Sequence, residues 1–518
     1  MKKTYLYIFL FLLSVNLLFT GGRIASSDET AYFLEAQSVV ERGTLAIPTG
    51  IVNNGAFGVD GRFYVGGGVG YTILGAPMYA FGLLITKALP IPETYSLFVL
   101  KGIFTLINPI LCALLGLLMI HYLRFMSVSW GFAFLWASAL LFTTNVFVYS
   151  KSSMREPLIT VCVLMAIMEI FTFGRTSLRK HLHLAGIAAG WLVLIKPSFL
   201  IFVPVFGLYL VWVLYDNRLH VKDWLRAANV VIPVSIFSAW VSVFIGMAVC
   251  YNWLIFGGPF TSGYSKIQNP FSNPFLVGVY GLLFSSGKSL FLYAPLTILI
   301  FPAARCFLQR EFKLFTAITV VCCTFIALHA KFVAWAGDGS WGPRYLLPIV
   351  PLLFIVIGTY AYETIKKNRT LRFMIQTLAV IGLLIQFGGM TIYLGSYYRY
   401  LGEYPYTREF SDPEFLYKSH FVPNYSPVVG HWELMGKAIS KHWNGDIGVL
   451  SIRATDERIP LSDEDRSKVT YLIDYWFMYL YYAGVSKILI LLSVIVMVGF
   501  VIVAGWNVRR QLQKVEIQ

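Results

Sequence analysis

Apolar runs of about 20 residues recur along most of the chain, and a helix of that length spans the hydrocarbon core of a bilayer. Of the 518 residues, 57% are hydrophobic and 13% are charged, whereas soluble domains carry about 25% charged residues. We therefore expect an all-α polytopic membrane protein of about 12 transmembrane helices. The runs are residues 4–20, 97–123, 130–149, 156–174, 184–198, 199–215, 228–250, 288–304, 314–335, 345–363, 372–395 and 485–507.

Basic residues predict the topology. The loops 173–183, 215–226, 304–313 and 366–372 and the tail 507–514 are rich in Lys and Arg, as is the N-terminus. Short basic loops stay in the cytoplasm, and all of these fall on one side if the further apolar run 71–89 does not cross. We expect 71–89 to lie at the interface and both termini to be cytoplasmic in a cell inner membrane.

The opposite, periplasmic side then receives a large first loop, residues 21–96, and a second long segment, residues 397–484, rich in Tyr, Pro and charge. We divide the chain into a transmembrane catalytic domain, 1–396, a periplasmic segment that holds the acceptor, 397–484, and a last helix with its tail, 485–518. Tyr and Trp suit stacking on sugars.

Several classes of function receive no support. The net charge of +15 is explained by the loops beside the spans, so we expect no nucleic-acid partner. The six cysteines include no CxxC pair, and we predict neither a disulfide framework nor a metal site. The stretch "SSGKSLF" lacks the spacing of a phosphate-binding loop. No cofactor is expected.

The first candidate site is the pair Asp28 and Glu29, which follows the first apolar run. The next apolar residues recur at spacings of three and four, which indicates an amphipathic helix at the interface. A purely structural alternative is that Asp28 caps this helix. Against it, a carboxylate beside lipid is costly unless it pairs or works.

Three more charged residues lie at the same predicted face. Glu156 precedes Pro157, where a helix begins, so dipole compensation or an ion pair with Arg155 or Lys151 is an alternative to catalysis. Lys196 interrupts an apolar stretch, and snorkelling is its alternative. Arg344 stands just before a span.

Together these groups suit a sugar donor carried on a polyprenyl phosphate. Lys or Arg can bind the phosphate, and a carboxylate can act as general base for an acceptor hydroxyl. Phosphate is a good leaving group, and we expect inversion because retention normally needs a second carboxylate as nucleophile.

The stretch "SSDETAYFLEAQSVVERGTLAIP" (26–48) resembles the first outer loop of bacterial lipid-carrier-dependent glycosyltransferases of the GT-C superfamily, relatives of the protein O-mannosyltransferases and of the aminoarabinose transferase of lipid A. Four further stretches resemble one bacterial branch: "GRFYVGGGVGYTILGAPMYAFG", "FGGPFTSGY", "GLLFSSGKSLFLYAPL" and "SWGPRYLLPIVPLL". The resemblance covers residues 1–400 and implies a bundle with juxtamembrane helices in the first outer loop.

The resemblance also implies roles for individual residues. Asp28 would be the catalytic base with Glu29 beside it, Glu156 the second outer acid, and Lys196 and Arg344 the binders of the carrier phosphate. Further expected substrate contacts are Tyr32, Tyr64, Arg155, Lys288, Asp338 and Tyr345. The implied partners are a lipid-linked sugar donor and a glycan, lipid or protein acceptor.

Two other functions fit parts of the sequence. A transporter or flippase of a lipid-linked sugar places its charges near the bilayer midplane and often shows inverted repeats. An oligosaccharide transferase with a pyrophosphate donor relies on a divalent metal, for which the Asp-Glu pair is weak support.

Overall fold

The computed structural model describes residues 2–52, 55–218, 228–264, 269–337, 339–402, 417–450 and 467–517. Helices dominate this part of the chain, with one two-stranded antiparallel hairpin in which Gly55 pairs with Val65. The α-helices and strands are α1 (Lys2–Phe19), α2 (Ser27–Arg42), β1 (Gly55–Phe57), β2 (Phe63–Val65), α3 (Thr72–Ala88), α4 (Glu93–Phe104), α5 (Ile107–Phe125), α6 (Trp130–Phe142), α7 (Val146–Ser150), α8 (Glu156–Thr176), α9 (Lys180–Ile195), α10 (Phe202–Arg218), α11 (Ala228–Phe256), α12 (Phe275–Phe284), α13 (Leu290–Tyr293), α14 (Ile300–Arg310), α15 (Phe312–Lys331), α16 (Val350–Thr364), α17 (Arg369–Thr391), α18 (Leu394–Tyr400), α20 (Pro427–Trp443), α22 (Trp476–Tyr482) and α23 (Lys487–Ile517). Short helical turns are η1 (Pro197–Ile201), η3 (Pro295–Leu299), η4 (Arg344–Ile349), η5 (Tyr417–Phe421) and η6 (Pro423–Tyr425).

Long apolar helices confirm the predicted class of fold. Within the described residues, nine are long and apolar enough to cross a membrane: Lys2–Phe19, Tyr95–Phe125, Glu156–Thr176, Pro197–Tyr215, Asn229–Phe256, Phe312–Lys331, Arg344–Thr364, Arg369–Thr391 and Lys487–Glu516. The predicted runs 130–149 and 184–198 form shorter apolar helices, α6 and α9. The run 288–304 differs, because Pro295 separates α13 from η3 and α14. Proline has no amide hydrogen to continue a helix.

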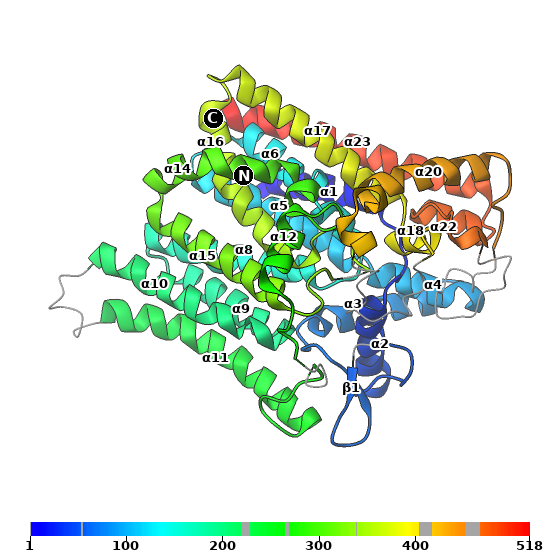
Figure 1. Ribbon diagram of the computed structural model, residues 1–518, viewed down its shortest axis with the longest axis horizontal. Coiled ribbons are helices and arrows are strands. Elements are labelled where there is room, and N and C mark those ends of the chain that lie inside the picture. Colours follow the sequence, from blue (N-terminus) through cyan, green and yellow to red (C-terminus); the bar gives the residue numbers. More distant parts are fainter. Residues whose placement is uncertain are drawn as a thin grey trace.

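Contacts between helix ends indicate that the basic loops within the described part of the chain lie at one end of the bundle. Arg175 at the end of α8 forms an ion pair with Glu311, between α14 and α15, at 2.7 Å. The amide of Gly131, at the start of α6, donates to Glu516 near the end of α23 at 3.0 Å. Both chain termini lie at this end, close to each other (Figure 1). We call it the basic end, and the opposite end the site end.

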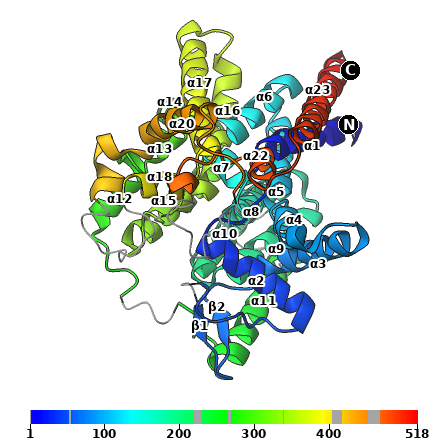
Figure 2. The same ribbon diagram turned by 90° about the vertical axis from the view of Figure 1, so that its right-hand side faces the viewer.

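Helix α3 begins and ends at the site end. Immediately before it, the amide of Gly70 donates to the carbonyl of Leu194 at the end of α9 (3.1 Å). Shortly after it, the Tyr95 hydroxyl donates to the carbonyl of Ala483, which follows α22 (3.4 Å). The run 71–89 therefore does not cross the bundle, in agreement with the topology predicted from the basic loops. Figure 2 shows α2, α3, α4 and the β1–β2 hairpin together, away from the chain termini.

The described parts of segment 397–484 pack directly on the membrane-spanning helices. Tyr397, Tyr398 and Leu434 share one buried cluster with Ile385 of α17, and α20 packs against α17. Aromatic side chains bury large areas, so this contact contributes several kcal/mol. The first and last long helices, α1 and α23, also pack side by side (Figure 1). The site end is thus covered by segments from both halves of the chain.

Candidate functional site

Helix α2 begins with a capping box that occupies Glu29. Ser26 accepts a hydrogen bond from the Glu29 amide, and Glu29 Oε2 accepts from the amides of Ala25 (2.9 Å) and Ser26 (2.8 Å). Glu29 Oε1 accepts from the amide of Ser153 at 2.6 Å, which ties α2 to the loop before α8. All these partners are backbone donors that would otherwise be unpaired at a helix start. Glu29 therefore ties the start of α2 to the loop before α8.

Asp28 is not the cap, so its side chain is available for another contact. Arg344 Nη2 lies 2.7 Å from Asp28 Oδ2, and Arg344 Nε lies 2.7 Å from Glu156 Oε1. One guanidinium thus joins α2, α8 and η4, segments that are far apart in sequence. Arg suits this bridge because its donors are fixed in a planar fork.

The two carboxylates differ in exposure, and this separates their roles. The Asp28 side chain is 18% exposed and that of Glu156 is 4% exposed. Glu156 Oε2 is buried and has no hydrogen-bond partner among the described residues. Asp28 is thus the more accessible of the two carboxylates, whereas Glu156 lines the smaller of two cavities at the site.

Lys196 lies beside this bridge in an aromatic cage. It follows α9, where the amides of Gly68 and Gly70 donate to the carbonyls of Ile195 and Leu194. A Cβ at Gly68 would come 2.0 Å from the Leu194 oxygen, so only glycine permits this approach. The glycine-rich stretch 64–71 therefore places Lys196.

The Lys196 ammonium lies 5.2 to 5.6 Å from the ring centres of Phe199, Phe332 and Tyr345. Within the described part of the chain it forms no ion pair with a carboxylate. Burial lowers the pKa of Lys196 to about 7, and the positive charges of Arg155 and Arg344 add to the shift. An anion bound beside Lys196 would favour the charged ammonium form over the neutral amine.

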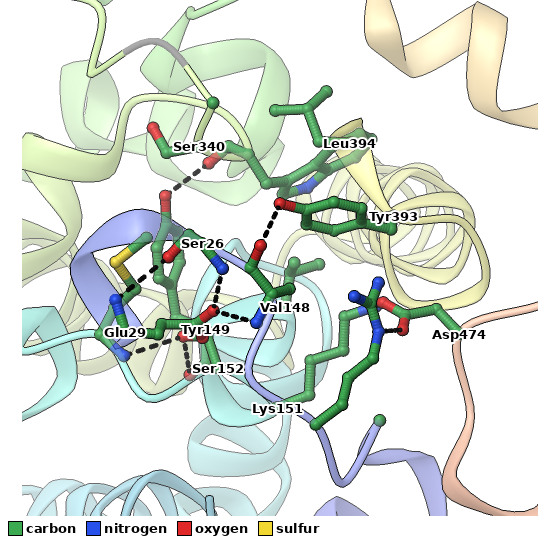
Figure 3. Close-up of a pocket in the computed structure, with 17 residues that line it drawn as sticks. Ser26, Glu29, Val148, Tyr149, Lys151, Ser152, Ser340, Tyr393, Leu394 and Asp474 are labelled. Atoms are coloured by element: carbon green, nitrogen blue, oxygen red, sulfur yellow. Dashed lines mark hydrogen bonds and ion pairs between the residues drawn. The ribbon is translucent and has the colours of Figure 1, made fainter. Parts of the chain in front are cut away.

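Two cavities border the loop between α7 and α8. The smaller is lined by Arg155, Glu156, Lys196, Phe199, His329 and Tyr345, among others. The larger, of about 70 Å³, is lined by residues that include Ser26, Glu29, Tyr149, Lys151, Tyr393 and Asp474 (Figure 3). The two cavities near the Arg344 bridge thus differ in their lining. The smaller is rich in cations, and the larger is lined by tyrosines and an ion cluster.

The ion cluster in the larger cavity was not predicted from the sequence. Asp474 Oδ1 lies 2.9 Å from Arg23 Nε, and Asp474 Oδ2 lies 2.6 Å from Lys151 Nζ. Burial alone would raise the pKa of Asp474, but the two cations hold it well below its usual range. Lys151, considered as a partner of Glu156, is paired with Asp474 instead.

The other predicted substrate contacts are distributed unevenly. Arg155 donates to the hydroxyl of Tyr264 at 2.8 Å and lies over the ring of Tyr32, beside the bridge. Tyr345 packs against Lys196 and His329.

Two further predicted contacts are not brought to the bridge, and a third lies outside the described part of the chain. Tyr64 lies in the hairpin, where its hydroxyl donates to Asp60. Lys288 is buried and donates to the carbonyl of Ser340 at 2.6 Å, so it supports the loop before Arg344. Asp338 lies outside the described residues.

His329 is the residue at the site that sequence reasoning missed. It lies in α15, lines the smaller cavity and stacks on Tyr345 with 4.6 Å between ring centres. A single histidine inside an apolar run was the available signal, since polar groups inside spans are costly and usually functional.

Fold and site together define a polytopic helical membrane protein with a cluster of acids and cations at one end of its bundle. No family model and no curated protein matches the chain. Among solved structures, it is similar to ArnT from Cupriavidus metallidurans in the apo state, with 14% identity, a TM-score of 0.45, and coverage of 92% of this chain and 75% of that one. It is similar to the same protein bound to undecaprenyl phosphate, with 16% identity and the same TM-score and coverage.

Proposed function

We propose that this chain transfers a sugar from a polyprenyl-phosphate-linked donor to a hydroxyl of a glycan, lipid or protein acceptor, with inversion at the anomeric carbon. The observation that carries the proposal is the Asp28–Arg344–Glu156 bridge, with Lys196 beside it and both carboxylate oxygens of the bridge 2.7 Å from one guanidinium. A carboxylate near solvent and a buried cation that forms no ion pair with a carboxylate among the described residues are the groups that such a transfer needs.

The chemistry can be written for these residues. Asp28 takes the proton of the acceptor hydroxyl, and the oxygen attacks the anomeric carbon. The bond between that carbon and the phosphate oxygen breaks, and the polyprenyl phosphate leaves with the electron pair. Lys196 and Arg344 bind the phosphate and stabilise the charge that develops on it. No general acid is required, because phosphate is a weak base.

The larger cavity is our proposed acceptor site. Segment 397–484 contributes Asp474 to its lining, and Tyr149, Tyr393 and Trp341 contribute aromatic surface. Aromatic rings pack well against the apolar faces of sugars. The side chains in Figure 3 point into this space from the first outer segment, the α7–α8 loop and the region after α17.

Transfer in detergent tests the function. The purified chain is mixed with radiolabelled undecaprenyl phosphate sugars and with a cell-envelope extract as acceptor. An enzyme forms product without a sealed membrane, whereas a flippase does not, so the absence of any product over a panel of sugars would contradict the proposal. The anomeric configuration of the product, read by NMR, tests inversion. Mass spectrometry of envelope glycans from a strain without the gene identifies the missing sugar.

We propose that the site end faces the periplasm and that both termini are cytoplasmic. The support is that the basic loops lie together at the other end, as short cytoplasmic loops do. We expect a cysteine introduced at Ser27, which is exposed, to react with an impermeant maleimide in intact spheroplasts. A cysteine at Leu178, which is 50% exposed at the basic end, should react only after lysis. The opposite pattern, each measured against the parent chain with its own cysteines, would reverse the orientation.

Lys196 should make donor binding depend on pH. Its pKa of about 7 means that the ammonium loses its charge as pH rises through this value, and an uncharged amine no longer attracts phosphate. We expect the affinity for farnesyl methyl phosphate, a diester that does not titrate in this range, to fall about tenfold between pH 7 and pH 8.5.

The matched control for this experiment is Lys196→Arg. Arginine stays charged at all these pH values, so its binding curve should be flat. An equal pH dependence in the wild type and in Lys196→Arg would show that another group titrates, and Lys196 would lose its proposed role.

A further inference from the structure

Helix α20 has three faces of different character. Its buried face packs against α17 and α18. One exposed flank is polar and contains Glu433, which forms an ion pair with Lys437 at 2.8 Å. The other exposed flank is apolar, and its members recur at spacings of three, seven and four residues, so they form one stripe along the helix. This apolar stripe consists of Val429, Trp432, Ile439 and Trp443.

The apolar stripe is well exposed. The exposed fraction is 51% for Ile439, 65% for Val429 and 90% for Trp443. Single exposed apolar residues are common on protein surfaces, but a continuous row of them marks contact with another protein or with a membrane. The stripe therefore needs a partner, and its surroundings identify which one.

The stripe continues a surface that faces lipid. Helix α17 belongs to the apolar helices that are long enough to span a membrane. Near its site end Phe387 is exposed, and its ring centre lies 6.0 Å from that of Trp432. Leu383 and Leu384 are also exposed and lie one turn earlier on the same face of α17. The lipid-facing surface of α17 thus runs onto the stripe of α20 without a break.

Helix α23 shows how far lipid extends toward the site end. Its exposed apolar side chains begin at Ile488, directly after the helix starts. It packs beside α1, with Gly505 next to Phe11. At 1.5 Å per residue, α1 continues about 12 Å beyond this contact, to Phe19, whereas α23 continues about 26 Å, to Ile488. The lipid-facing surface of α23 therefore extends well beyond the end of α1.

Helix α20 lies at the depth that α23 reaches beyond α1. Its start is beside the end of α17, where residues 474–476 donate backbone hydrogen bonds to Thr391 and to Thr20, which follows α1. Its end is tied to the residues before α23, because His442 Nε2 lies 2.8 Å from the Tyr482 hydroxyl. Figure 1 shows α20 and the start of α23 at the same end of the molecule, and Figure 2 shows the two helices apart.

We propose that α20 is embedded in the lipid leaflet at the site end, with its apolar stripe against lipid and its polar flank toward water. The partner of this surface is the bilayer itself, and the inference does not depend on sugar transfer. Trp443 ends the helix, and tryptophan is enriched at the boundary between membrane and water. Because α20 packs on α18, whose Leu394 lines the larger cavity, contact with lipid holds a wall of that cavity in place.

Collisions of nitroxide spin labels with two reagents test the inference. Single cysteines replace Val429 or Ile439 in the stripe, and Glu433 or Ser440 on the polar flank, in a chain whose three exposed native cysteines are changed to alanine. The labelled protein is placed in nanodiscs of phosphatidylethanolamine and phosphatidylglycerol. Oxygen concentrates among acyl chains, whereas nickel ethylenediaminediacetate stays in water. We expect oxygen to collide more often than the nickel complex at both stripe positions, and the reverse at both polar positions.

Ser440 is the matched control for Ile439, because the two residues are adjacent and both exposed. A melting temperature near that of the parent chain shows that each labelled variant is folded. If the nickel complex prevails on both flanks, α20 is surrounded by water and the inference is overturned. If both reagents are excluded from the stripe, protein covers it, from this chain or from a second copy, and the inference is overturned as well.

A substitution with glutamate gives a second readout. A carboxylate in contact with lipid is costly, so Ile439→Glu should lower the melting temperature in nanodiscs, whereas Ser440→Glu should leave it near the value of the parent chain. Equal melting temperatures for the two variants would contradict the contact with lipid. Transfer by the wild-type chain would support the proposed function whatever the outcome of these experiments, so the two proposals fail separately.

Discussion

Asp28→Asn should remove sugar transfer and leave the fold intact. We expect kcat/KM to fall by about 10²- to 10⁴-fold, the range for loss of a general base. Asparagine cannot take a proton, but its amide oxygen can still accept from Arg344, which also keeps its contact with Glu156. Donor affinity and melting temperature should therefore stay near the wild-type values, and transfer in detergent is the measurement.

Asp60→Asn is the matched control for that experiment. Asp60 lies in the same outer segment, but its carboxylate accepts from the Tyr64 hydroxyl in the hairpin and its side chain is 43% exposed. This variant should transfer sugar at the wild-type rate. If Asp28→Asn also retains near-normal transfer, Asp28 is not the base, and Glu156 becomes the carboxylate to substitute next.

Asp474→Asn should have the largest effect on stability. Its carboxylate faces two cations, Arg23 and Lys151, inside the protein. Removing the carboxylate that forms ion pairs with two buried cations costs about 3–5 kcal/mol. We expect a large fall in the melting temperature in detergent, and loss of folded protein at 37 °C. Leu or Met at position 474 should be no better, because neither supplies a negative charge to the two cations.

The pH dependence of this contribution has a definite sign. The folded-state pKa of Asp474 is below its unfolded value, so the stabilisation is complete at neutral pH and is lost as pH falls below about 4. Glu433→Gln is the control, because the Glu433–Lys437 pair is exposed on α20 and such pairs contribute little. Equal melting temperatures for Asp474→Asn and Glu433→Gln would show that the buried cluster does not stabilise the fold.

Much of the transmembrane architecture could be predicted from the sequence, because apolar runs and basic loops act locally. The exceptions also have local causes. The run 130–149 stops being one helix after Phe142, where two threonines and Asn145 interrupt it. Pro197 ends the run 184–198, and Pro295 breaks the run 288–304. These residues interrupt a helix even where the surrounding sequence is apolar.

The site was predictable only in part. The sequence placed four residues at one predicted face of the membrane, and the resemblance to the GT-C superfamily gave them a common site. These residues are Asp28, Glu156, Lys196 and Arg344. The structural role of Glu29 was readable too, since Ser26 and Glu29 have the spacing of a capping box. The Asp474 cluster could not be predicted, because Asp474 lies 451 positions after Arg23 and 323 positions after Lys151 in the chain. No local sequence pattern encodes such a pairing.

That long-range cluster has a consequence for how the protein is made. The ribosome synthesises Arg23 and Lys151 early and delivers their counterion only when residue 474 emerges. Until then, the nascent chain lacks the carboxylate that forms ion pairs with both cations in the folded protein. Residue 474 thus completes a cluster that begins near the N-terminus, and we expect chains truncated before it to be less stable and to be degraded faster.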